Sequence, residues 1–71
     1  MSVLKVIELM GNSAESFEKA VENVIAQASK TVHNIKSVYI QDMQVSVDNN
    51  KIVQYRVTTK VAFEISAQES F

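Results

Sequence analysis

The chain has 71 residues, of which 46% are hydrophobic, and its single glycine and lack of proline leave no linker, so we expect one domain over residues 1–71. Seven lysines and arginines nearly balance eight aspartates and glutamates without clustering, which argues against binding to nucleic acid. No cysteine is present, which excludes disulfides and thiolate metal sites, and the charged first residues predict neither a signal peptide nor a membrane span. We therefore expect a cytoplasmic protein.

A strand followed by a helix is predicted for the first half. Residues 3–10 are rich in valine, isoleucine and leucine, and Gly11 follows where we expect the strand to turn into the helix. The helix is predicted over Asn12–Asn34, with Asn12 or Ser13 capping its start, Lys30 in its last turn and Asn34 as a left-handed cap. Its apolar residues recur every three or four positions and form one stripe: Phe17, Ala20, Val21, Val24, Ile25, Ala28 and Val32.

Two further strands are predicted for the second half. Residues 35–47 form the second strand, and a change in apolar parity predicts a bulge around Gln41 and Asp42. Residues 48–50, Asp-Asn-Asn, predict a turn. The third strand alternates strictly, with its apolar face formed by Tyr55, Val57, Thr59, Val61, Phe63 and Ile65.

These elements predict an α+β fold of order β-α-β-β, a three-stranded antiparallel sheet around one amphipathic helix. The third strand is expected in the middle because it is the longest and best patterned. At this length only about 60% of the unfolded surface is buried on folding, so one helix packed on three strands is only marginally stable as a single copy. Both faces of the first two strands carry large apolar residues, more than one helix can cover, so we expect contacts with other copies of the chain.

Few residues suggest reaction chemistry. His33 is the only histidine and is expected to lie exposed at the helix end. The serines have no neighbouring base, so no catalytic constellation is predicted and an enzyme is not expected. Asp42, Asp48 and Glu64 could offer oxygen ligands to a hard cation, but they lack calcium-loop spacing, and solvated surface charge is the favoured interpretation.

Three residues of the strands remain open to more than one interpretation. Tyr39 and Tyr55 suit a core or subunit contact better than a stacking site. Arg56 lies on the polar face of the third strand, where its donors could meet a carboxylate, a phosphate or a neighbouring subunit. A solvated charge is an equally good interpretation of Arg56.

The ordered segments KVIELMG, NSAESF, KTVHNI and YRVTTKVAFEI together resemble the dodecin family over about residues 3–65. The resemblance implies a hollow homododecamer that binds, stores or sequesters a small ligand and does not turn over substrate. The ligand implied by default is a flavin, riboflavin or FMN, stacked between tryptophans and hydrogen-bonded by a glutamine of the last strand.

Carried over residue by residue, the resemblance assigns four pocket positions to Ser37, Asp42, Gln44 and Arg56. Ser37 stands where flavin-binding members have the tryptophan, and Arg56 stands where they have the glutamine, so the key flavin contacts are missing and flavin binding is expected to be weak. Gln44 takes the place of an arginine of some bacterial members, and Asp42 matches an acidic position. The pair of Tyr55 and Arg56 resembles the calcium dodecins, which implies a cation-binding or purely structural shell as the alternative, with metal ligands that the sequence does not identify.

Overall fold

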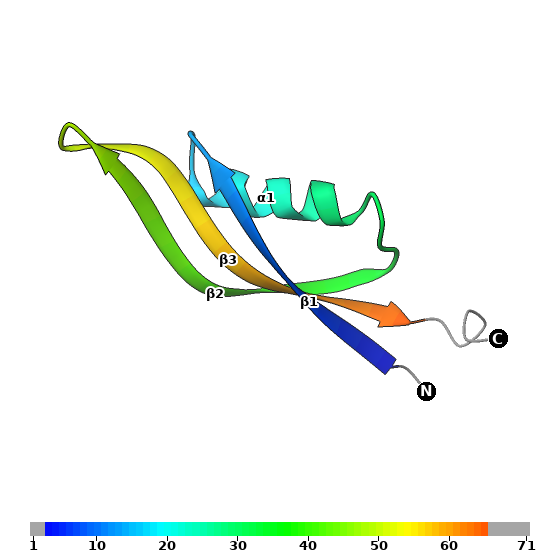
Figure 1. The fold of residues 1–71 in the computed structure, drawn as a ribbon. Coiled ribbons are helices and arrows are strands. Elements are labelled where there is room, and N and C mark those ends of the chain that lie inside the picture. Colours follow the sequence, from blue (N-terminus) through cyan, green and yellow to red (C-terminus); the bar gives the residue numbers. More distant parts are fainter. Residues whose placement is uncertain (1–2, 66–71) are drawn as a thin grey trace.

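A computed structural model describes residues 3–65, which form four elements: β1 (Val3–Ser13), α1 (Phe17–Ala28), β2 (Ile35–Asp48) and β3 (Lys51–Ile65). The strands form one antiparallel sheet in the order β1-β3-β2. Figure 1 shows the long sheet curving, with α1 lying along one of its faces. The predicted β-α-β-β order, the α+β class and the central place of the third strand are confirmed.

The core lies between α1 and the alternating strand β3. Val57, Thr59 and Val61 of β3 are buried, and Val57 and Val61 form a cluster with Ala20 and Val24 of the helix. At the start of α1, the ring of Phe17 meets Tyr55 edge-on, with centroids 5.1 Å apart. The odd residues of β3 therefore face the helix, as their alternation predicts.

Gly11 does not turn the chain into the helix, contrary to the prediction. It lies inside β1 opposite Val57, and its φ is not positive. A Cβ built at this position would lie 2.5 Å from Cγ2 of Val24 and 2.7 Å from the carbonyl oxygen of Ala20. The missing side chain thus lets α1 pack directly on the strand backbone.

The helix begins later than predicted because β1 continues past Gly11. Asn12 and Ser13 pair with β3 as strand residues, so neither caps the helix. The N-cap is Ser16, whose hydroxyl accepts a hydrogen bond from the Lys19 amide at 3.0 Å. The hydroxyl of Ser13 accepts from the Glu15 amide at 2.9 Å and stabilises the turn between strand and helix.

The helix also ends earlier than predicted. Its C-cap is Ser29, so Lys30 lies beyond the last turn. Asn34 has the expected left-handed backbone, with φ of 61°, but it leads into β2, and its carbonyl accepts a hydrogen bond from the Glu64 amide of β3 at 3.0 Å. Within residues 3–65, no helix has the length and apolar character needed to cross a membrane.

The hairpin of β2 and β3 carries the predicted turn and the predicted bulge. Asn49 and Asn50 both have positive φ, 52° and 64°, as a tight two-residue hairpin turn requires. The pairing shifts by one residue between Ile40 and Asp42, which confirms the bulge, and it shifts twice more, at Lys36 and near the hairpin tip. These shifts bend the sheet that Figure 1 shows.

Candidate functional site

A row of three polar side chains crosses the sheet on the face opposite the helix. Arg56 pairs with Asn12 of β1 and with Gln44 of β2, and directly paired residues project to the same side of a sheet. Val57, the next residue along β3, faces α1, and successive residues of a strand point to opposite faces. The row containing Arg56 therefore points away from the helix. We call Asn12, Arg56 and Gln44 the polar row.

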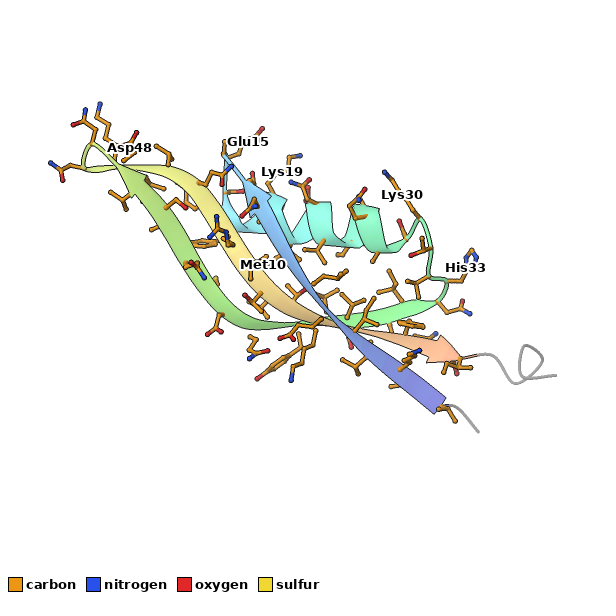
Figure 2. All side chains as sticks on the ribbon, in the orientation of Figure 1. Met10, Glu15, Lys19, Lys30, His33 and Asp48 are labelled. Carbon is orange, nitrogen blue, oxygen red and sulfur yellow. The ribbon has the colours of Figure 1, made fainter. Side chains whose placement is uncertain are left out.

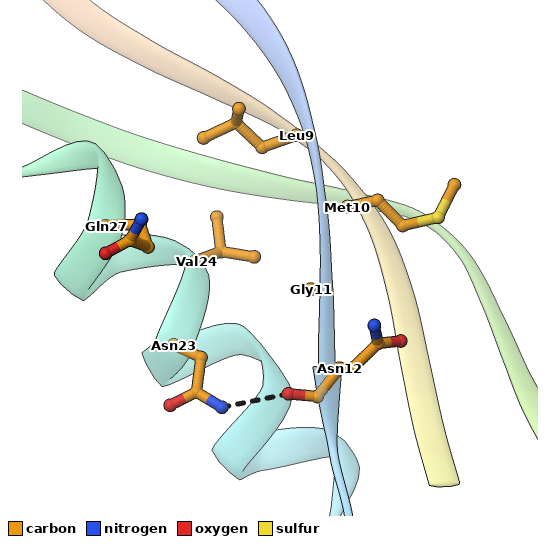
Figure 3. Close-up of a pocket in the computed structure, with 7 residues that line it drawn as sticks. All are labelled: Leu9, Met10, Gly11, Asn12, Asn23, Val24 and Gln27. Atoms are coloured by element: carbon orange, nitrogen blue, oxygen red, sulfur yellow. Dashed lines mark hydrogen bonds between the residues drawn. The ribbon is translucent and has the colours of Figure 1, made fainter.

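The guanidinium of Arg56 is held in place by Asn12. Its Nε donates a hydrogen bond to Oδ1 of Asn12 at 2.8 Å. The backbone carbonyl of Asn12 in turn accepts a hydrogen bond from Nδ2 of Asn23 on α1 at 2.9 Å, the dashed line in Figure 3. Asn12 thus links the helix, the edge strand and the central strand. It is not among the predicted site residues, because the two partners lie 44 residues apart and only the register of the sheet brings them together.

The structure brings together three of the four predicted pocket positions. Asp42 pairs with Thr58, one row along the same face from Gln44 and Arg56. Ser37 pairs with Ala62, six residues along β3 from Arg56, which corresponds to roughly 20 Å of extended strand. The bulge at Gln41 changes the parity of β2 and so places the odd-numbered Ser37 and the even-numbered Asp42 on one face.

The other candidate residues lie apart from the polar row. His33 is exposed, as expected, and Figure 2 shows it at the opposite end of the molecule from Asp48 in the hairpin. Glu64 forms an ion pair with Lys36 at 3.6 Å. In the part of the chain that the structure describes, no three histidines, aspartates or glutamates gather as they would around a metal ion.

A groove of about 430 Å³ lies between α1 and the edge strand β1. Figure 3 shows its lining, which mixes apolar side chains with amides: Leu9, Met10, Gly11, Asn12, Asn23, Val24 and Gln27. In the same view, the side chains of Met10 and Asn12 extend away from the helix. The groove and the polar row therefore occupy opposite sides of β1 and share Asn12. Its backbone lines the groove, and its side chain belongs to the polar row.

Comparison of the chain with known proteins points to one family. The family model described as Dodecin matches residues 3–66. Calcium dodecin from Mycobacterium tuberculosis is 31% identical over 65 residues, which cover 92% of each chain.

Two solved structures share the fold. The dodecin from Streptomyces davaonensis superposes with a TM-score of 0.86 at 28% identity, covering 92% of this chain and 96% of its own. The calcium dodecin structure from Mycobacterium tuberculosis, which is described with a novel calcium-binding site, has a TM-score of 0.79 at 29% identity, and the match covers 93% of this chain and 94% of that chain. With the family model spanning almost the whole length, this chain belongs to the dodecin family.

Proposed function

We propose that the protein is a single-domain dodecin of residues 1–71 that assembles into a hollow homododecamer and binds, stores or sequesters a small ligand. The observation that carries this proposal is the amount of apolar surface that one chain leaves uncovered. The structure exposes large apolar side chains along all three strands and at one position of α1, Ile25; those of the strands are Val3, Leu4, Val6, Met10, Tyr39, Ile40, Met43, Val45, Val47, Ile52, Val53 and Ile65. Surface of this kind is typical of subunits that bury it against each other.

The shape of the chain supports assembly. Its radius of gyration is 14.6 Å, whereas a compact domain of this length has one of about 11 Å. Its accessible surface is 5255 Å², compared with roughly 4,400 Å² for a folded monomer of the same mass. A chain this extended gains stability when its faces are covered by neighbours.

The uncovered residues lie on both faces of the sheet. Ile40, Met43 and Val45 of β2 pair with helix-facing residues of β3, but α1 packs over β1 and β3 and leaves them exposed. Leu4 and Val6 of β1 are exposed on the opposite face. Apolar patches on two faces call for two kinds of subunit contact, which a closed shell with several symmetry axes provides.

The ligand that the family resemblance implies is a flavin, and the sequence departs from that pattern at Ser37 and Arg56. A hydroxymethyl side chain offers no ring for stacking, and aromatic pairs contribute about 0.5–1.5 kcal/mol each beyond burial. The expected affinity for riboflavin or FMN is therefore low. Since Ser37 lies far along the strand from Arg56, a ligand that contacts both positions would occupy a pocket shared between copies.

Restoring the family residues tests this pocket. We expect Ser37→Trp combined with Arg56→Gln to raise riboflavin affinity at least tenfold, because each pocket regains a stacking ring and a neutral hydrogen-bonding partner. The measurement is a titration that follows quenching of riboflavin fluorescence. Tyr39→Trp serves as the control, since it adds a tryptophan on the same strand outside the four positions. An unchanged titration of the double variant would show that the pocket lies elsewhere.

A cation-binding shell is the second candidate, favoured by the 31% identity with calcium dodecin. Asp42 and Asp48 are exposed carboxylates of the kind that bind calcium. The cation-binding hypothesis predicts that calcium raises the thermal midpoint of unfolding, whereas riboflavin or an equal concentration of magnesium does not. Asp42→Asn should reduce the calcium effect if this position supplies a ligand, with Asp48→Asn as the matched comparison. A midpoint that calcium leaves unchanged would exclude this candidate.

The assembly itself is tested by the native mass. Twelve chains of 7.9 kDa give a particle of about 95 kDa. Native mass spectrometry reports both this mass and any small molecule that co-purifies. A folded species of one chain at low micromolar concentration would contradict the proposed assembly.

A further inference from the structure

The charge of Arg56 has no acidic partner in the part of the chain that the structure describes. Its side chain is partly buried, yet neither ion pair recorded within residues 3–65 involves it. Asp42 lies one row away on the same face, but it forms no ion pair with Arg56 within residues 3–65. A guanidinium that has lost part of its hydration without gaining a carboxylate is well suited to an anionic partner.

The geometry of the polar row leaves its donors available. The Nε of Arg56 is occupied by Asn12, and this hydrogen bond fixes the guanidinium plane while the two Nη groups keep their N–H donors. The amide of Asn12 uses its oxygen in the same bond, so its Nδ2 remains a donor. Gln44 adds another amide on the opposite side of Arg56. The row therefore presents donors from three adjacent strands on one rigid sheet.

We propose that the polar row of Asn12, Arg56 and Gln44 binds the carboxylate or phosphate group of a small molecule. The paired Nη donors of Arg56 match two oxygens of such a group, and Asn12 acts as a positioning residue that orients the guanidinium. The exposed side chain of Met10, one row away on β1, offers apolar contact to the remainder of the molecule. This inference rests on the proposed ligand-binding function and names the chemistry that the ligand carries.

Calorimetric titration of the intact protein tests the proposal. Inorganic phosphate and acetate are titrated separately at constant ionic strength set with sodium chloride, and the two titrations distinguish a phosphate site from a carboxylate site. We expect Arg56→Gln to weaken the binding of the preferred anion at least tenfold. Arg56→Lys keeps the positive charge but loses the paired Nη donors of the guanidinium, so it should retain only part of the affinity. Asn12→Ala should weaken binding about threefold to tenfold, because Arg56 keeps its charge but loses the hydrogen bond that orients its guanidinium.

Lys60→Gln is the matched control, because it removes a positive charge from the same face of β3 two rows away. Its affinity should equal that of the unaltered protein. Equal affinity in the Arg56→Gln variant, or equal losses in the Arg56→Gln and Lys60→Gln variants, would overturn the proposal. Native mass is recorded for every variant, and dissociation of the Arg56→Gln particle without an anion effect would also overturn it by making Arg56 a subunit contact.

The two proposals fail in different ways. The polar row is complete within one chain, so anion binding is measurable even if the native mass is that of a monomer. A monomer that binds phosphate through Arg56 would contradict the assembly and support the row. A dodecamer that binds neither phosphate nor acetate would support the assembly and contradict anion binding by the polar row.

Discussion

Two single residues, Gly11 and Asn12, decide how the helix and the central strand are held. Gly11 brings α1 within contact of the strand backbone, and Asn12 accepts hydrogen bonds from both Asn23 and Arg56. Local sequence signals assign both residues to the start of the helix, because glycine and asparagine are common at such boundaries. Pairing with Val57 and Arg56 of β3 keeps them in the strand instead. The site residue Asn12 was missed for this reason, since its role depends on a partner far along the chain.

Gly11→Ala is predicted to destabilise the protein by about 1–3 kcal/mol, the usual range for overpacking a filled core. The added methyl group meets the carbonyl oxygen of Ala20, which belongs to the helix backbone and cannot move away without shifting α1. Thermal unfolding at a fixed protein concentration measures the effect. Ala14→Ser, which adds one atom in the exposed turn before α1, is the control and should leave the midpoint unchanged. A Gly11→Ala variant as stable as the control would show that the helix is free to move outward.

At the scale of elements, the patterns that repeat along the chain were predicted and the boundaries that depend on tertiary pairing were not. Strict alternation identified β3 as the central strand, and the parity change located the bulge at Gln41. The helix was predicted over Asn12–Asn34 but spans only Phe17–Ala28, because strand pairing extends β1 and the chain after Ser29 leads into β2. The pocket positions came from the family resemblance, and register was needed to show that Ser37 lies apart from the others.

The hairpin turn offers a test of element geometry. Asn50 has φ of 64°, a conformation that costs glycine less than asparagine, and Asn-Gly is the preferred pair for this turn. Asn50→Gly is therefore expected to raise stability by about 0.5 kcal/mol, and Asn50→Ala to lower it by about 1 kcal/mol. Denaturant unfolding of both variants measures the difference. Glu22→Gly, at an exposed position in the middle of α1 where φ is not positive, is the control with the opposite expectation, because glycine there should destabilise the helix. Equal stability of the Gly and Ala variants at position 50 would argue against the left-handed turn.

At the scale of the whole molecule, the small core and the large exposed surface have one cause. In the described residues the fully buried hydrophobic side chains are few and small: Ala20, Val24, Ala28, Val57 and Val61. The molecule extends 54 Å along its longest axis, and the long sheet places its remaining apolar residues beyond the reach of a 12-residue helix. In the proposed assembly, neighbouring copies cover this apolar surface and add to the stability of each chain, so a change at a subunit contact should lower the thermal midpoint of unfolding.

Met43→Glu tests this dependence on neighbours. Met43 is exposed on the helix-facing side of β2, where α1 does not reach, so the single chain can accommodate a charge at this position. If another copy covers this patch, burying a carboxylate there without a partner is strongly unfavourable, and the native particle should fall from about 95 kDa to smaller species with a lower thermal midpoint. Ala26→Glu adds the same charge at an exposed position of α1 outside the groove and is expected to leave the mass unchanged. Native mass spectrometry with circular dichroism separates loss of assembly from loss of folding. A Met43→Glu particle of unchanged mass would show that this side of β2 faces solvent in the assembly.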